Sequence, residues 1–243
     1  MISVTTVVVF IIVGLALSLF GGGGAIILIP YMKIGMSLPV DQAAMLSLIT
    51  IGLNTGAQSV IDRETIQWKA VTVFSMIAFP ATALCGTYLA PVVPDEIRMI
   101  SFGVFTLTVA GLMFFPFKPK ARDKQNLLGI GLAAAATGVL CGLVGVGGGI
   151  FIAPALSLFY GISIKEAVKS SLAIVAVQSV TALFAYLARG VRVDLSVAGV
   201  MLVLVAIGVV SGRWIKGFIP DKNLKKYFAV FLVGIGIWVL MRP

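Results

Sequence analysis

The sequence contains no histidine and few charged residues, since Asp, Glu, Lys and Arg make up only 11% of its 243 residues. Soluble domains carry about 25% charged residues, so this composition excludes an ordinary soluble protein. Without histidine, the chain lacks the most common metal ligand and the most common general base of enzymes. We therefore expect a protein that is not an enzyme and that binds no cofactor.

Cysteine is scarce as well, and both cysteines, Cys85 and Cys141, lie inside apolar runs. They are interpreted as small core residues rather than as a disulfide or a metal pair. All acidic residues lie at expected loops or helix ends, and so do the basic residues. The acidic residues are Asp41, Asp62, Glu64, Asp95, Glu96, Asp123, Glu166, Asp194 and Asp221. We therefore expect no buried Lys or Arg and no carboxylate inside the membrane for binding a cation or relaying protons.

What the chain has in abundance is apolar sequence, with 60% hydrophobic residues. Most of its uncharged stretches reach the roughly 18–20 residues that cross about 30 Å of hydrocarbon. These stretches are 1–32, 42–61, 70–94, 99–117, 125–164, 170–188, 195–212 and 227–241. The first one lacks a basic segment and a small-residue cleavage site, so we expect it to be retained. The chain is therefore expected to be a polytopic, all-α membrane protein in contact with lipid.

The formal net charge of +9 does not indicate a nucleic-acid-binding protein. The basic residues fall in short loops between apolar stretches, where the positive-inside bias of membrane proteins accounts for them. No basic face or aromatic platform accompanies the charge, so no nucleic-acid partner is expected.

An internal repeat divides the chain into residues 1–117 and 125–243, joined by the basic segment 118–124. At an offset of 124 residues, GGGGAIILIP (21–30) aligns with GVGGGIFIAP (145–154), and Pro30 meets Pro154. The same offset places Ser47 on Ser171 and Asn54 on Gln178. Such internal repeats are typical of secondary transporters.

Charge distribution decides between two arrangements of these repeats. Stretch 125–164 holds 40 uncharged residues, about 60 Å as one helix and twice the hydrocarbon thickness. If each glycine-rich segment crosses the membrane once, the repeats are parallel and the 18 Lys and Arg divide 9 to 9 between the two sides. If each is a hairpin that returns to its side of entry, three crossings follow, the repeats are inverted and the division is 13 to 5.

The positive-inside rule favours the hairpin arrangement, because the loops are short enough for the rule to apply. The side with five basic residues then holds Lys33, Arg98, Arg189, Arg192 and Arg242. The predicted fold is therefore two inverted repeats, each a broken-helix hairpin with a glycine tip followed by three transmembrane helices. Segment 118–124 becomes a cytoplasmic linker, and both termini lie outside the cytoplasm.

The hairpin tips predict an anion-binding site. Residues after each turn, 25–34 and 149–160, can form a short helix whose free N–H groups point at the turn. Glycine permits close approach of a ligand and positive φ angles, although glycine also serves close helix packing. The candidate substrate-binding residues at the tips are Gly21, Gly22, Gly23, Gly24, Ala25, Gly145, Gly147, Gly148 and Gly149, with Pro30 and Pro154 as structural residues.

Polar side chains follow each tip. Ser47, Thr50, Asn54 and Gln58 share one helical face, and Ser171, Gln178 and Thr181 form the matching stripe. Polar groups in a bilayer are costly unless they are paired, so both stripes should face the protein interior. Hydrogen bonding between helices explains the Ser and Thr residues as well as a cavity does. For Asn54 and Gln178 we favour a role as donors to a bound anion, together with Ser47 and Ser171.

The paired motifs GGGGAIILIP and GVGGGIFIAP, in a basic chain of this length, resemble the sulfite exporter TauE/SafE family of membrane permeases. The resemblance covers essentially the whole chain. It implies transport, often outward, of a small anion such as sulfite, sulfoacetate or a related C1–C2 organosulfur compound. The family's glycine-rich motifs correspond to residues 21–24 and 145–149 here, and repeat one has four plain glycines where repeat two has GVGGG.

The sequence leaves three other functions open: an anion channel built from the same repeats, a membrane subunit that transports nothing, and an intramembrane enzyme. The enzyme is the least favoured of these, because the chain has no GxSxG element and no acid–base pair inside the membrane. Coupling is also open. A proton could travel on the substrate, or H⁺ or Na⁺ could be a coupled ion, with Na⁺ bound by carbonyls at the broken helices. The oligomeric state is undetermined, and a homodimer is one option.

Overall fold

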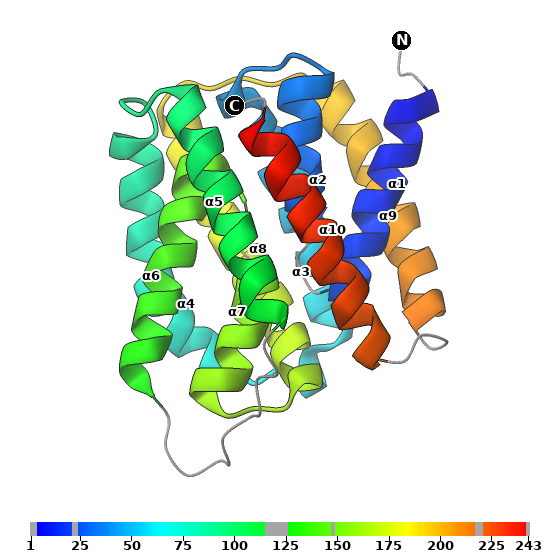
Figure 1. Cartoon of the computed structure of the whole chain (residues 1–243). Coiled ribbons are helices and arrows are strands. Elements are labelled where there is room, and N and C mark those ends of the chain that lie inside the picture. Colours follow the sequence, from blue (N-terminus) through cyan, green and yellow to red (C-terminus); the bar gives the residue numbers. More distant parts are fainter. Residues whose placement is uncertain (1–3, 21–23, 115–125, 147–148, 217–220, 242–243) are drawn as a thin grey trace.

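The computed structural model describes residues 4–20, 24–114, 126–146, 149–216 and 221–241, and in this part of the chain every regular element is helical. The first half contains α1 (Val4–Phe20), α2 (Gly24–Pro30), α3 (Val40–Ile61), α4 (Trp68–Leu84) and α5 (Asp95–Phe114). The second half contains α6 (Leu127–Val144), α7 (Gly149–Ala155), α8 (Ile164–Ala188), α9 (Leu195–Lys216) and α10 (Asp221–Leu240). The helices form one bundle, and α1 begins at the same end of it as α10 ends (Figure 1).

Short π-helical turns continue several of these helices. Tyr31–Gly35 extends α2 and Leu156–Tyr160 extends α7, so each short helix begins after a glycine-rich segment and continues well past its proline. A third π-helical turn, Cys85–Leu89, extends α4. The short helices expected over 25–34 and 149–160 are thus confirmed. π-Helical turns inside α-helices are often found at functional sites.

The first hairpin consists of α1 and α2. A Cβ atom added at Gly24 would lie 2.9 Å from the carbonyl oxygen of Val13, so the start of α2 lies beside the middle of α1. At the other end of the pair, the hydroxyls of Thr6 and Tyr31 lie 2.8 Å apart, and the ring of Phe10 contacts that of Tyr31 edge-on. The chain therefore returns to the side from which α1 starts.

The second hairpin consists of α6 and α7. The amide of Asn126, just before α6, donates to the carbonyl of Phe159 at 2.9 Å, which ties the beginning of α6 to the end of the α7 segment. This hairpin opens toward the end of the bundle opposite to that of the α1–α2 hairpin (Figure 1). In the described residues, α2 runs back along α1 and α7 runs back along α6, as the hairpin arrangement predicts; residues 21–23 and 147–148 lie outside the described residues.

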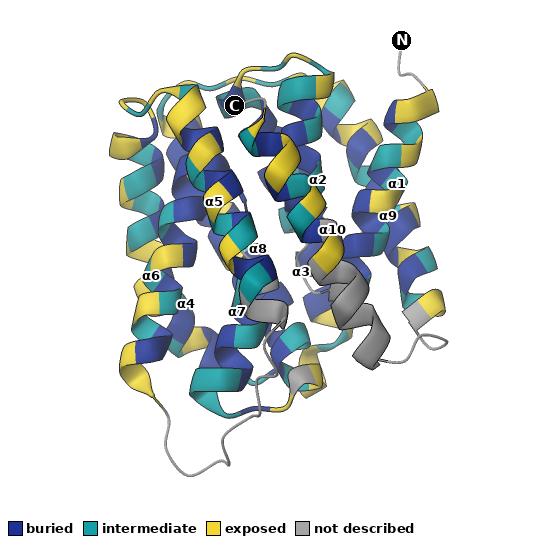
Figure 2. Cartoon of the chain, viewed as in Figure 1, coloured by how far each residue is buried: buried dark blue, intermediate teal, exposed yellow. Residues whose placement is uncertain are grey.

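The outer surface of the bundle indicates a membrane protein. Five of the described helical segments are long and apolar enough to cross a bilayer: 40–61, 68–89, 127–144, 165–188 and 195–215. Exposed positions run along the outward faces of the helices (Figure 2), and many carry large apolar side chains, such as Met76, Phe184 and Val210. Exposed apolar surface on this scale is suited to lipid rather than to water. The chain is an integral membrane protein.

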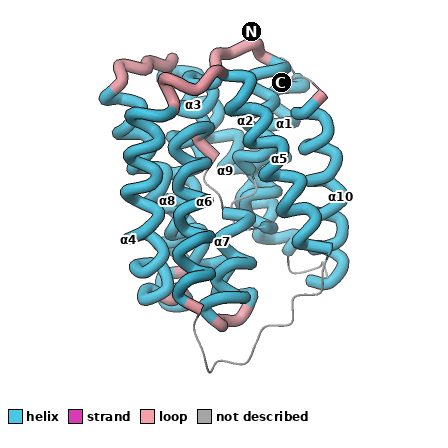
Figure 3. Tube along the Cα trace, turned by 60° about the vertical axis from the view of Figure 1, so that its left-hand side comes forward, coloured by secondary structure: helices cyan, strands magenta, loops and turns pink. Residues whose placement is uncertain are grey.

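Loops gather at the two ends of the bundle, apart from a short loop inside it between α6 and α7 (Figure 3). Helix α1 packs against α9, and α6 packs against α4, so each hairpin contacts a long helix of the other half. Helices α3 and α8 form a further pair, as do α5 and α10. The division into 1–117, 118–124 and 125–243 and the inverted relation of the halves stay predictions, and the linker lies outside the described residues.

The contact between each hairpin and its partner helix is made backbone to backbone. A Cβ added at Gly208 of α9 would overlap the carbonyl oxygen of Ile11 and lie 2.9 Å from Cα of Gly14. A Cβ added at Gly138 of α6 would lie 2.6 Å from the carbonyl oxygen of Ala78 in α4. Small residues allow this close approach of helices in membranes.

We predict that Gly208→Ala lowers the thermal unfolding midpoint of the detergent-purified protein, because the added methyl group must push α9 away from α1. Gly199→Ala, in the same helix, is the matched control, since a Cβ at Gly199 meets no atom within 4 Å. Alanine is favoured over glycine in helices by about 1 kcal/mol, so the control should keep or raise the midpoint. Equal midpoints for the two variants would contradict this packing.

Candidate functional site

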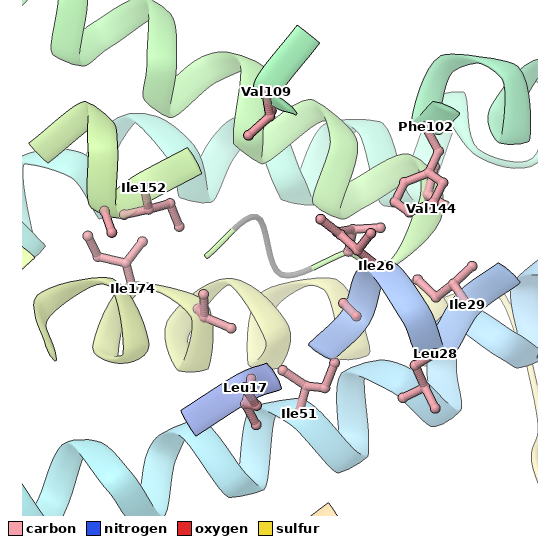
Figure 4. Close-up of a cluster of buried hydrophobic side chains, with 14 of the residues drawn as sticks. Leu17, Ile26, Leu28, Ile29, Ile51, Phe102, Val109, Val144, Ile152 and Ile174 are labelled. Atoms are coloured by element: carbon pink, nitrogen blue, oxygen red, sulfur yellow. The ribbon is translucent and has the colours of Figure 1, made fainter. Parts of the chain in front are cut away.

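The described residues that flank the two glycine-rich turns lie in the interior of the bundle. Gly24, Ala25 and Gly149 are buried, as are Val144 and Val146. Ile26, Val144 and Ile152 belong to one hydrophobic cluster, which Figure 4 shows in close-up with side chains from both hairpins. The structure therefore brings the flanks of the two tips into one core. Gly21, Gly22, Gly23, Gly147 and Gly148 lie outside the described residues.

Gly145 ends α6 and requires glycine for two reasons. Its φ angle is +78°, a left-handed conformation that other residues rarely adopt. A Cβ at this position would also lie 2.7 Å from Cα of Ala44, so the tip of α6 rests directly on α3. The glycine that the sequence places at the turn thus supports both the helix end and a close contact with the helix that carries Ser47.

The polar stripe of α3 is buried, as expected. Ser47, Thr50, Asn54 and Gln58 are all less than 9% exposed. The Asn54 side chain donates from Nδ2 to the carbonyl of Thr50 at 2.8 Å, within its own helix. The hydroxyl groups of Ser47 and Thr50 have no protein partner. Two buried hydroxyl groups of this stripe therefore remain available for a ligand.

The stripe of α8 is buried too. The Gln178 side chain donates from Nε2 to Thr137 of α6 at 3.5 Å, while its Oε1 has no protein partner. Ser171 donates to the carbonyl of Val168 at 2.8 Å. Gln178 therefore makes the kind of bond between helices that ordinary packing would produce, and it keeps one unpaired acceptor.

Asn54 and Gln178 do not share a hydrogen bond in the described structure. Helices α3 and α8 instead meet at Gly52, where a Cβ would lie 2.8 Å from Cβ of Ser179. Gln178 lies against α6, because it bonds Thr137 and because the thiol of Cys141 donates to its carbonyl oxygen at 3.8 Å. The pairing of Asn54 with Gln178 around one ligand stays a prediction.

The expectation that no Lys or Arg is buried is wrong. Arg98, in the first turn of α5, is 2% exposed. Its Nε donates to the carbonyl of Leu143 at 2.6 Å, and its terminal nitrogens donate to Asp41 at 2.7 Å and to the hydroxyl of Tyr186 at 2.9 Å. The guanidinium group thus holds the last turn of α6, next to Gly145.

Sequence position alone placed Arg98 at a helix end, and it does lie there. Its long side chain, however, extends into the interior of the bundle. The positions of charged residues along the sequence do not predict the direction in which a side chain points. The i,i+3 spacing of Asp95 and Arg98 predicts their local ion pair, which the structure contains at 3.3 Å, but it does not indicate burial.

Arg98 belongs to a network at the end of the bundle where α1 begins. Asp41 accepts from Arg98 on one carboxylate oxygen and from Arg189 on the other, at 2.7 and 2.6 Å. Lys33 pairs with Asp95 at 3.2 Å. Asp41, Asp95, Arg98 and Arg189 line a pocket of about 310 Å³ together with the segment 90–94.

The opposite end carries a second, more exposed network. Asp62, after α3, pairs with Lys169 at 3.2 Å and with Arg213 at 3.3 Å. The sequence placed Lys169 and Arg213 on the richly basic side, and Lys33, Arg98 and Arg189 on the other. In the described residues, Lys169 and Arg213 share Asp62, whereas Arg98 and Arg189 share Asp41 and Lys33 pairs with Asp95.

Comparisons with known proteins agree with this architecture. The profile of the family described as "Sulfite exporter TauE/SafE" matches residues 6–239. A "Probable membrane transporter protein" of Xylella fastidiosa is 25% identical over 95% of this chain and 92% of its own length. A probable membrane transporter protein of Methanocaldococcus jannaschii is 26% identical over 97% of this chain and 94% of its own length. No solved structure matches the chain with significance.

We predict that Arg98→Met destabilises the protein by about 1.5–3 kcal/mol, because it removes a charged donor from the buried carbonyl of Leu143 and the hydroxyl of Tyr186 and leaves Asp41 with one arginine instead of two. Lys33→Met is the control, since Lys33 also pairs with Asp95 but its side chain is 29% exposed. Its loss should cost about 1 kcal/mol or less. Thermal and denaturant unfolding of the purified variants would measure both effects, and similar losses would contradict a buried role for Arg98.

Proposed function

The chain belongs to the sulfite exporter TauE/SafE family, and on this premise we propose that it is a secondary transporter of a small anion. The relatives are described as probable membrane transporter proteins, and the family is one of transporters rather than enzymes. The substrate class that we propose is sulfite, sulfoacetate or a related organosulfur anion, and the proposed direction is export.

The proposed binding site lies between the two hairpin tips. The observation that carries it is that two buried hydroxyl groups of α3, those of Ser47 and Thr50, have no protein partner, while Gly145 at the α6 tip packs on Ala44 of the same helix. Buried polar groups in proteins are almost always paired, so unpaired ones need an explanation such as a ligand or water. Hydroxyl groups can donate to an anion, and the starts of α2 and α7 would add backbone N–H groups.

Neutral donors suit a transporter because they bind an anion without trapping it. A fixed positive charge at the same place would strengthen binding and slow release, since charge-assisted hydrogen bonds are about twice as strong as neutral ones. Arg98 holds the carbonyl of Leu143 near the α6 tip. In the proposed site it positions that tip, while Ser47 and Thr50 contact the substrate.

Alternating access is proposed to arise from inverted repeats. Two observations support this: the hairpins open toward opposite ends (Figure 1), and the helix contacts match across the halves. The 124-residue offset places Gly14 on Gly138, and each of these glycines lies against a helix of the other half. Inverted repeats allow one group of helices to rock against another around a site at the midplane.

We predict that Thr50→Val weakens binding of sulfite severalfold and leaves the unfolding midpoint unchanged or slightly raised. Valine has the shape of threonine, and the Thr50 hydroxyl forms no protein hydrogen bond that stability would lose. Binding would be measured by calorimetry on purified protein with sulfite and sulfate, and transport by sulfite flux in proteoliposomes. Saturable, concentrative flux would identify a transporter rather than a channel.

Thr55→Val is the matched control for this experiment. Thr55 is equally buried in the same helix, but its hydroxyl donates to the carbonyl of Ile51 at 2.8 Å. Its substitution should leave sulfite binding unchanged. Wild-type affinity in Thr50→Val would place the site elsewhere, and no binding or flux in the wild type would overturn the proposed function.

Both termini are proposed to lie outside the cytoplasm. The basis is the division of 13 basic residues on one side and five on the other, together with the positive-inside rule. We predict that alkaline phosphatase fused after residue 243 is active in a bacterial host and that green fluorescent protein fused there is dark. The reverse pair of signals would contradict this orientation.

A further inference from the structure

Asp41 is held between two arginines in the arrangement that an oxyanion takes. Arg98 donates to one of its oxygens at 2.7 Å, and Arg189 donates to the other at 2.6 Å. Guanidinium groups bind carboxylate, sulfonate and phosphate oxygens through the same charge-assisted contacts. The carboxylate therefore marks the position where a free oxyanion would satisfy both arginines equally well.

The two arginines are held in place without Asp41. Arg98 donates to the carbonyl of Leu143 and to the hydroxyl of Tyr186, and the latter donates in turn to carbonyls of α6 at 3.1 and 3.2 Å. Arg189 donates to the carbonyl of Gly86 at 3.4 Å, and its guanidinium carbon lies 5.1 Å from the centre of the Tyr186 ring. These contacts would keep both guanidinium groups in position if the carboxylate moved away.

Asp41 is the less constrained member of the cluster. Its side chain is 28% exposed, against 2% for Arg98 and 13% for Arg189. The hydrogen bonds of its carboxylate in the described structure all come from these two arginines. A change of the Asp41 side-chain rotamer would release its carboxylate from the arginines without moving the buried first turn of α3.

The adjacent pocket offers space for a ligand. Its volume of about 310 Å³ is roughly ten times the 30 Å³ that a water molecule occupies in the liquid. Asp95 also lines it, and its carboxylate is paired with Lys33, with Arg98 and with the amide of Val40. When Asp41 departs, Arg189 loses its carboxylate partner and Arg98 keeps only the 3.3 Å contact with Asp95, so the charged residues that line the pocket carry a net positive charge.

We propose that this pocket is a second anion site, at which a small oxyanion passing this end of the bundle replaces the carboxylate of Asp41 on Arg98 and Arg189. The proposal rests on the proposed function as an anion transporter. Exchange of one anion for another keeps both guanidinium groups paired throughout, which avoids the cost of several kcal/mol for an unpaired buried charge. It also breaks the ion pairs that join Asp41 of α3 to Arg98 of α5 and to Arg189 at the end of α8, so arrival of the oxyanion loosens this end.

The affinity of this site for a free oxyanion is expected to be low. The oxyanion must compete with the carboxylate of Asp41, which belongs to the same chain and is therefore present at a high effective concentration. The bound oxyanion favours the loosened state, because only that state offers it both arginines. The Asp41 carboxylate is therefore displaced from the two arginines when the substrate binds, and it pairs with them again after the substrate has left.

Removing the competing charge tests the proposal. Asp41→Asn in the full-length protein is expected to lower the dissociation constant for sulfate or sulfite by about tenfold, equivalent to 1.4 kcal/mol. A purely structural ion pair predicts no gain in affinity. Asp62→Asn is the matched control, because Asp62 also lies between two cations, Lys169 and Arg213, at the other end of the bundle. Its affinity for the anion should equal that of the wild type.

A double variant that carries both Asp41→Asn and Arg189→Gln provides a second test. It should bind the anion more weakly than Asp41→Asn alone, with a dissociation constant close to that of the wild type. Unchanged or weaker binding in a folded Asp41→Asn variant, or equal gains in Asp41→Asn and Asp62→Asn, would overturn the second site. Anion flux in the wild type with unchanged binding in Asp41→Asn would leave the transport function intact. Tight anion binding by Asp41→Asn without any wild-type flux would overturn the transport function and keep the site.

Discussion

Backbone amides and carbonyls cannot be left unpaired in hydrocarbon, and this constraint governs the whole arrangement. Two helices end inside the bundle, and the residues beside their turns, such as Ala25 and Val146, are buried. The surrounding helices enclose these breaks, since α3 packs on α2 and α8 packs on α7. Where the backbone is not satisfied by its own helix, long side chains complete it, as Arg98 does for the carbonyl of Leu143.

Much of this architecture was predictable from the sequence, because it depends on local patterns. Apolar run length indicated the helices, a stretch of 40 uncharged residues required a fold-back, and the repeated glycine segments located it at 145–149. The polar stripe on α3 is buried as its helical spacing predicts. Arg98 could not be placed in the same way. Its burial depends on Leu143, Asp41 and Tyr186, which are far apart in sequence and meet only through tertiary packing.

The ends of the bundle differ more than the two similar halves would suggest. One end is held by a buried guanidinium group that reaches the α6 tip, and the other by Asp62 with two partly exposed cations. The tight contacts differ as well, since Ser18 of α1 lies against Gly212 of α9 where the matching contact joins Gly142 and Gly86. The two ends of the bundle are therefore held together by different kinds of contact.

The backbone contact between α1 and α9 also bears on how the protein is made. Helix α1 leaves the ribosome first, yet its partner spans Leu195–Lys216, so its glycine face stays without that partner until most of the chain has been synthesised. Helix α6, in contrast, meets an α4 that already exists. The first hairpin therefore depends on a late, non-local closure, and the second can assemble as it emerges. The contact of α1 with α9 can thus form only after α9 has been synthesised, whereas α6 can pack against α4 as soon as it emerges.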